Sequence, residues 1–166
     1  MIVSNGRKMF GNGSILKAGI ATGEVKWNDG TAITTSVTQT NMYLDEARTA
    51  NNQRGVHMFL GVGTTAPTEA DYWLDETEVD GTDINSIITC SSASVSGTGG
   101  NPVYTFTFYN NSSTDSFTVT ELCICDLPYN AGGAGERFIM LARKVLATPR
   151  TIAPHETVVF AYEIDF

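Results

Sequence analysis

Residue types that carry chemistry are scarce in this chain. It has 166 residues, of which 3 are Cys and 2 are His, and charged residues make up 17%. An odd number of cysteines, with Cys123 and Cys125 spaced by one residue, does not suit a disulfide framework. With only His57 and His155 besides, a metal site lacks ligands. We expect small buried cysteines, no metal and no cofactor, in a protein made and kept in a reducing cytosol until assembly.

Basic residues are absent from a long central stretch. No Lys or Arg lies between Gly55 and Glu136, and the net charge is −8. This balance argues against nonspecific binding to nucleic acid, which needs basic side chains to displace counterions. Solvated loops explain the uneven charge most simply, and the alternative is complementary patches that meet between subunits. The basic residues lie on both sides of the stretch: Arg7, Lys8, Lys17, Lys26, Arg48, Arg54, Arg137, Arg143, Lys144 and Arg150.

Long hydrophobic runs are also absent, so we expect no membrane span, and we expect no signal peptide. Instead the chain contains short segments in which apolar and polar residues alternate, which is typical of strands with one buried face. Three such segments place on one face Val56, Met58 and Leu60; Tyr104, Phe106 and Phe108; and Val158, Phe160, Tyr162, Ile164 and Phe166.

The segment 116–127 is expected to return as an antiparallel partner of the strand at 103–109. Alternation places Phe117, Val119, Cys123 and Cys125 on one face of it. Glu121 falls on that same face, so it needs a partner or an edge position. Pro154 and His155 are expected to form the turn into the last strand.

Several short strands separated by turn-forming residues predict an all-β protein. The expected architecture is an antiparallel β-sandwich, like a jelly roll or a Greek key, with one short helical turn. Residues 1–54 differ in pattern, with a hairpin-type turn at Asn28–Gly30. We therefore divide the chain into an N-terminal arm or small subdomain, 1–54, and a β-sandwich domain, 55–166.

The stretch 59–75, FLGVGTTAPTEADYWLD, contains a glycine pair that resembles a dinucleotide fingerprint. That fingerprint requires a long helix after the glycines and a parallel βαβ unit, and neither is expected here. We therefore interpret Gly61 and Gly63 as the end of a strand at a sharp bend. Thr65 and Pro67 would then begin a short helical turn.

Tyr72 and Trp73 follow this turn, and two interpretations remain open. The pair could form a sugar-stacking platform, or it could cover an edge of the sheet as a lid. The acidic loop 75–83 resembles a calcium loop weakly, through Glu78, Asp80, Gly81 and Asp83, and a solvated loop is the simpler interpretation. No pair of carboxylates and no nucleophile with a histidine base is evident, so we expect no catalytic residues and no enzyme.

The order of these segments resembles small virion structural proteins of tailed bacteriophages, found in tails, collars and fibres. The resemblance covers most of the chain from about Gly55 onward, and it depends on G-x-G-T-T-A-P-T-x-x-D-Y and on the closing R-x-V-L…I-A-P-x-E-T…Y-x-I-x-F. His155 stands where such proteins often have Gly. The motifs are patterns of sequence rather than of chemistry.

The resemblance implies a non-enzymatic β protein of the tail or neck apparatus, which assembles as a connector, ring or fibre-attachment component of the virion. Its expected partners are copies of itself and portal, tail or fibre proteins, with no nucleic acid and no membrane. The alternative is a module that binds a receptor or a carbohydrate, and a hydrolase is a third hypothesis without support in the motifs. Candidate interaction residues are Tyr72, Trp73, Arg143, Lys144 and Arg150.

Overall fold

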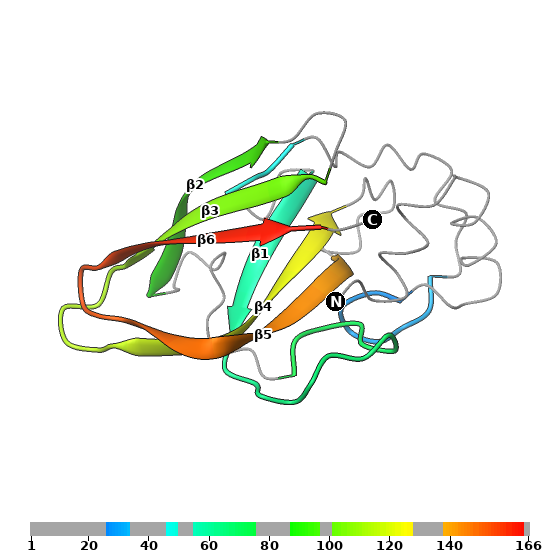
Figure 1. The fold of residues 1–166 in the computed structure, drawn as a ribbon, viewed down its shortest axis with the longest axis horizontal. Helices are drawn as coiled ribbons and strands as arrows, with labels where there is room; N and C mark the ends of the chain where they lie inside the picture. Colours follow the sequence, from blue (N-terminus) through cyan, green and yellow to red (C-terminus); the bar gives the residue numbers. More distant parts are fainter. Residues whose placement is uncertain are drawn as a thin grey trace.

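The computed structural model describes residues 26–33, 46–49, 55–75, 87–96, 101–127 and 138–164. Within these ranges the regular structure is entirely β, and no helix is present that could span a membrane. The strands are β1 (Gly55–Gly61), β2 (Ile88–Ser96), β3 (Val103–Asn110), β4 (Phe117–Leu127), β5 (Ile139–Ile152) and β6 (Thr157–Glu163). They form two antiparallel three-stranded sheets, in the orders β1-β4-β5 and β2-β3-β6 (Figure 1).

One hydrophobic cluster joins the two sheets. Alternating apolar side chains of β1, β3 and β6 enter it, as the sequence pattern predicted, and Phe166 alone of that set lies outside the described residues. The inward-facing side chains Tyr104, Phe106 and Phe108 of β3 are fully buried, and β3 is the central strand of its sheet. The predicted inward-facing residues found in the cluster are Val56, Met58, Leu60, Tyr104, Phe106, Phe108, Val158, Phe160, Tyr162 and Ile164.

The predicted partner of β4 was wrong. β4 pairs with β1 and β5, whereas β3 pairs with β2 and β6. The connection after Asn110 therefore does not close a hairpin but passes from one sheet to the other, and the corner between β5 and β6 does the same. Both connections lie at the same end of the molecule (Figure 1).

The prediction of which β4 side chains share one face holds only for the first part of the strand, because β4 contains an irregularity in its pairing with β5. Val119 points into the core shared by the sheets, but so do Leu122 and Ile124, while Cys123 and Cys125 belong to a second cluster. The register with β5 shifts between Val119 and Glu121, which reverses the alternation. A one-residue shift in a strand moves every later side chain to the opposite face.

Asn110 links the two connections between the sheets. Its side chain is fully buried, and its Nδ2 donates to the carbonyl oxygens of Asp115 (2.8 Å), Ile152 (3.2 Å) and Ala153 (3.0 Å). Its backbone carbonyl accepts from the N–H of His155 at 3.1 Å. His155 has φ 59°, in the left-handed region that favours glycine.

Replacing Asn110 with alanine is expected to lower the free energy of unfolding by about 2–3 kcal/mol, because the buried carbonyl of Ile152 and the part-buried bonds to Asp115 and Ala153 lose their donor. Urea denaturation measures this change. Asn111→Ala is the matched control, since the Asn111 amide is exposed and bonds only to Ile87 and Thr89. An Asn110→Ala protein no less stable than Asn111→Ala would contradict the prediction.

Parts of the N-terminal region pack on the sheets. The predicted hairpin-type turn at Asn28–Gly30 is confirmed: the N–H of Gly30 donates to the carbonyl of Trp27 at 2.9 Å, and Gly30 has φ 81°. Trp27 and Ile33, on either side of this turn, are buried in the shared core. The division at residue 54 stays a prediction.

Candidate interaction surface

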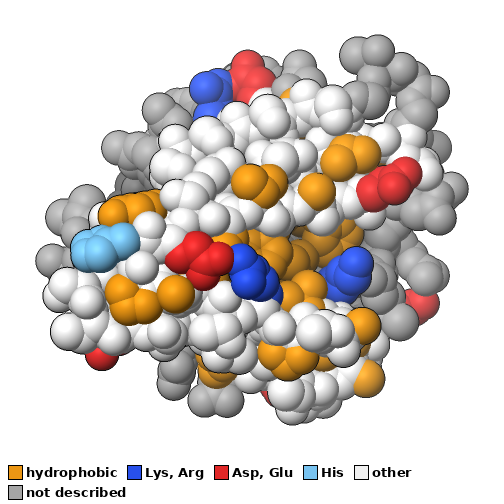
Figure 2. All heavy atoms as spheres, turned by 60° about the vertical axis from the view of Figure 1, so that its left-hand side comes forward, with side chains coloured by type: hydrophobic (Ala, Val, Ile, Leu, Met, Phe, Trp, Pro, Cys, Tyr) orange, Lys and Arg blue, Asp and Glu red, His pale blue; other side chains and the backbone are white. Residues whose placement is uncertain are grey.

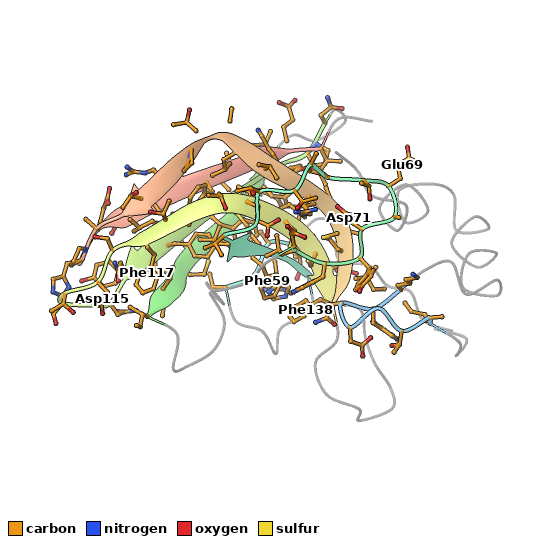
Figure 3. All side chains as sticks on the ribbon, turned by 90° about the horizontal axis from the view of Figure 1, so that it is seen from below. Phe59, Glu69, Asp71, Asp115, Phe117 and Phe138 are labelled. Atoms are coloured by element: carbon orange, nitrogen blue, oxygen red, sulfur yellow. The ribbon has the colours of Figure 1, made fainter. Side chains whose placement is uncertain are left out.

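The segment 62–75 leaves β1 and covers the outer face of the sheet β1-β4-β5. A second hydrophobic cluster lies there, and Trp73 packs against it. Its rings meet closely: the Phe59 centroid lies 4.9 Å from that of Trp73 and 4.8 Å from that of Phe138 (Figure 3). The cluster consists of Phe59, Leu74, Cys123, Cys125, Phe138 and Met140. The segment therefore closes a small core of its own on the face opposite the main one.

The helical turn predicted after Pro67 is not part of a helix. A single turn joins Thr68 to Asp71, whose N–H donates to the carbonyl of Thr68 at 3.3 Å. The carboxylate of Asp71 in return accepts from the N–H of Thr68 at 3.0 Å and from its hydroxyl at 2.6 Å. The same carboxylate also binds Arg143, which holds the chain in a loop instead of a continuing helix.

Arg143 holds the 62–75 loop against the sheet through side-chain hydrogen bonds. Its side chain, on β5, is buried, and it donates from Nε to Glu121 at 2.7 Å and from Nη1 to Asp71 at 2.7 Å. A third bond runs from Nη2 to the carbonyl of Thr65 at 3.0 Å. Burial lowers the pKa of Arg143, but the bonds and charges of Asp71 and Glu121 outweigh it, so the pKa ends above its ordinary value.

Glu121 is the partner of Arg143 and is fully buried, so the expectation that Glu121 needs a partner is confirmed. Its carboxylate also accepts from the backbone N–H of Gly63 at 3.1 Å and of Asp75 at 3.3 Å. The two ends of the loop are thus tied to one side chain of the central strand β4.

Gly63 has its role in this contact rather than in a phosphate site. A Cβ at Gly63 would lie 2.4 Å from Oε1 of Glu121 and 2.6 Å from Cβ of Asp75, so a side chain does not fit. The hydroxyl of Thr120 donates to the carbonyl of Gly63 at 2.8 Å. No helix follows among the described residues of this segment, whereas the dinucleotide fingerprint requires a long helix after the glycines.

Tyr72 and Trp73 face different surroundings. Tyr72 is 40% exposed, and Nζ of Lys26 lies 5.3 Å from the centre of its ring. A Cβ on Gly30 would lie 3.0 Å from the same ring, so Tyr72 also packs against the 26–33 turn. Trp73 is only partly exposed and packs inward on Phe59. The two rings therefore do not form a shared open platform.

Trp73→Ala is expected to lower the free energy of unfolding by about 2 kcal/mol, because it removes half-buried aromatic packing from the second cluster. Tyr72→Ala is the adjacent control, with an expected loss of less than about 1 kcal/mol. Thermal and urea denaturation of both variants measure the difference. Equal stabilities for the two variants would show that Trp73 does not close the cluster.

Lys144 and Arg150, also on β5, lie apart from this network and are exposed. In the register with β4, Lys144 lies opposite Leu122 and Arg150 lies opposite Val119. Leu122 and Val119 both point toward the space between the sheets. Arg150 forms an ion pair with Glu156, whereas no ion pair of Lys144 is found in the described part of the chain. Of the five candidate interaction residues, the structure thus joins Arg143 to the loop carrying Tyr72 and Trp73, and it separates Lys144 and Arg150 from them.

The three cysteines lie buried or partly buried in the described ranges. Cys123 and Cys125 are buried, as predicted, with their Sγ atoms 3.4 Å apart. Burial, followed by its contacts with Cys123, raises the pKa of Cys125 well above its ordinary value, and burial raises that of Cys90 to about 11. No group of three or more potential ligands is present there. Most of the proposed calcium loop 75–83 lies outside the described residues.

Asp126 is a buried acid that sequence reasoning missed. Its side chain is fully buried on β4, and within the described structure neither carboxylate oxygen has a hydrogen-bond partner. Its neighbours across the strands are Val56 and Ile139, both apolar. Burial raises the pKa of Asp126 to about 7. The only sequence signal for a buried acid was the Asp that ends the pattern C-I-C-D at 123–126. An Asp in this position is equally typical of the start of a loop.

Comparison of the chain with protein-family models, with curated proteins and with solved structures finds no match. The resemblance to bacteriophage virion proteins therefore stays a prediction from sequence.

Proposed function

We propose that this chain is a structural protein of a tailed-bacteriophage virion, in the tail or neck apparatus. In this role it acts as an oligomeric connector, ring or fibre-attachment component through contacts with other proteins. The proposal includes a β-sandwich of the jelly-roll or Greek-key kind, formed by the two sheets. The virion assignment depends on the sequence motifs, and the assembly role depends on the arrangement of charge.

One observation carries the assembly role. The charged side chains of the buried network, Arg143, Glu121 and Asp71, are occupied in fixing a loop to the sheet. Exposed charges of both signs remain at the surface: Lys144 and Arg150 lie on β5, where Arg150 pairs with Glu156, and Glu69 and Asp75 lie on the 62–75 loop. Surface charges of opposite sign favour specific association over uniform repulsion.

Size-exclusion chromatography with light scattering, over a wide range of protein concentrations, tests self-assembly. Binding to purified portal, tail and fibre proteins tests assembly with other components. We expect a defined oligomer, or a complex with at least one of these proteins. A strict monomer that binds none of them would contradict the proposed function.

A receptor- or carbohydrate-binding module is the alternative, and the exposure of Tyr72 is the feature that favours it. Because Trp73 packs inward, Tyr72→Ala rather than Trp73→Ala is the informative variant. This alternative predicts that a glycan array finds a ligand and that Tyr72→Ala abolishes its binding while the protein stays folded, with a stability loss of less than about 1 kcal/mol. An array with no signal above background would contradict it.

A further inference from the structure

A groove lies between β5 and β6, which are edge strands of different sheets. Opposite Thr120 of β4, the four residues Leu146–Pro149 of β5 have no partners in the register. This bulge interrupts β5, and Pro149 lacks the N–H that an edge strand offers to a neighbour. We call this region, bordered by Lys144–Arg150 of β5 and by β6, the β5–β6 groove.

The β5–β6 groove exposes part of the main core. The inward-facing residues Val158, Phe160 and Tyr162 of β6 keep 5%, 9% and 6% of their surface accessible. Val145 and Leu146 on the opposite side are only partly buried. Figure 2 shows hydrophobic side chains gathered in a hollow on this face, with basic and acidic side chains along its border. An apolar hollow of this kind suits an aromatic side chain of a partner.

Charged side chains border the groove, and one of them, Arg150, forms an ion pair with Glu156 next to β6. Lys144 and Arg150 stand on the two sides of the bulge, both exposed. Lys144 is exposed, and no ion pair of it is found among the described residues. A partner for this groove therefore combines an aromatic side chain with acidic neighbours.

The chain itself presents that combination. Tyr72 is one of three exposed large hydrophobic residues in the described ranges, and Glu69 and Asp75 are exposed on the same loop. We call Glu69, Tyr72 and Asp75 the acidic patch. Glu69 lies at one end of the molecule, whereas Asp115 and Phe117 lie at the other (Figure 3). Arg150 lies toward that other end, because it pairs with Val119, two residues from Phe117.

We propose that the acidic patch of one copy docks into the β5–β6 groove of a second copy, with Tyr72 entering the hollow and Lys144 and Arg150 contacting Glu69 and Asp75. The contact joins two different surfaces, so it is heterologous and generates a ring or an open filament. This inference rests on the proposed function, because it names the surfaces through which the proposed assembly occurs.

A charge exchange tests the contact. The groove variant carries Lys144→Glu and Arg150→Glu, and the patch variant carries Glu69→Lys and Asp75→Lys. Sedimentation velocity is expected to show that each variant alone associates at least ~10-fold more weakly than the wild type, and that an equal mixture associates again. Restored association in the mixture requires that the two surfaces meet, since each variant has only one of them altered.

Two controls separate this contact from general effects. Arg48→Glu makes the same charge change as Lys144→Glu, but Arg48 contacts β1, at the opposite edge of the sheet, so wild-type association is expected. Tyr72→Phe is expected to associate like the wild type, and Tyr72→Ala at least ~10-fold more weakly. Circular dichroism of each variant verifies folding.

The outcomes distinguish this inference from the proposed function. A wild-type protein that assembles while both charge variants assemble equally well overturns the groove contact and leaves the virion role standing. A wild-type protein that stays monomeric at every concentration also overturns the groove contact. The virion role is then contradicted only if binding to portal, tail and fibre proteins fails too.

Discussion

Replacing Glu121 with alanine is expected to lower the free energy of unfolding by about 3–5 kcal/mol, the range for breaking a buried ion pair from one side. The variant leaves Arg143 buried with one carboxylate partner, Asp71, in place of two. It also leaves the N–H groups of Gly63 and Asp75 without the acceptor that they have in the wild type. Urea denaturation at constant pH measures the loss.

Hydrogen exchange shows where the loss of stability occurs. In Glu121→Ala the amides of Gly63 and Asp75 are expected to exchange faster relative to those of β3, because the loop is released before the sheets separate. Glu163→Ala, an exposed carboxylate on β6, is the control and is expected to change stability by less than about 0.5 kcal/mol. A Glu121→Ala protein as stable as the control would show that the network does not hold the loop.

A double variant distinguishes the ion pair from the packing around it. Glu121→Leu with Arg143→Met removes both charges and retains apolar volume. Its loss of stability is expected to be smaller than the sum of the losses of the two single variants, because the double variant leaves neither charge of the pair buried without its partner. Additive losses would mean that the two side chains act independently.

The period-two pattern was sufficient for the strands that run without interruption. In β1, β3 and β6 the predicted inward-facing residues lie in the core, since each strand keeps one register along its length. The need of Glu121 for a partner could also be predicted, because a carboxylate within an apolar pattern is costly unless paired. Its partner, Arg143, could not be identified, since a residue on the neighbouring strand is selected by register.

Two features of the fold could not be predicted from local sequence patterns. The irregularity near Thr120 moves Cys123 and Cys125 to the other face, and no residue type at that position announces it. The connection after Asn110 looks like a hairpin loop, but the buried Asn110 amide binds the carbonyls of the β5–β6 corner and directs the chain to the other sheet. Both depend on contacts with residues far along the chain.

From the sequence, Arg143 was, like its neighbour Lys144, a candidate interaction residue. The strand gives the two side chains opposite directions: Arg143 binds the loop on the outer face, whereas Lys144 lies opposite Leu122 at the groove. Arg143 thus holds the loop of the acidic patch in shape, and Lys144 lies exposed on the groove that we propose for a second copy. The two surfaces of the proposed contact therefore share β5 as their common support.

Asp126→Asn is expected to make the protein more stable than the wild type above pH 7 and similar to it near pH 4. Burial raises the pKa of Asp126 from the ordinary value of 3.8 to about 7, so between these values the folded protein holds a proton that the unfolded chain has lost. The free energy of unfolding of the wild type therefore falls as the pH rises from about 4 to 7, and then levels off. At about 1.4 kcal/mol for each pH unit between the two pKa values, the cost reaches on the order of 4 kcal/mol.

The difference in stability between the wild type and Asp126→Asn, measured by urea denaturation at several pH values, isolates this group, because all other titrating residues are common to both proteins. Asparagine resembles the protonated acid in shape, so Asp126→Asn lacks the slope that the carboxylate produces. The control Glu163→Gln removes a carboxylate from an exposed position of β6 and is expected to change stability by less than about 0.5 kcal/mol across the range. A difference between wild type and Asp126→Asn that does not change with pH would mean that Asp126 stays ionised in the fold, which its apolar neighbours Val56 and Ile139 oppose.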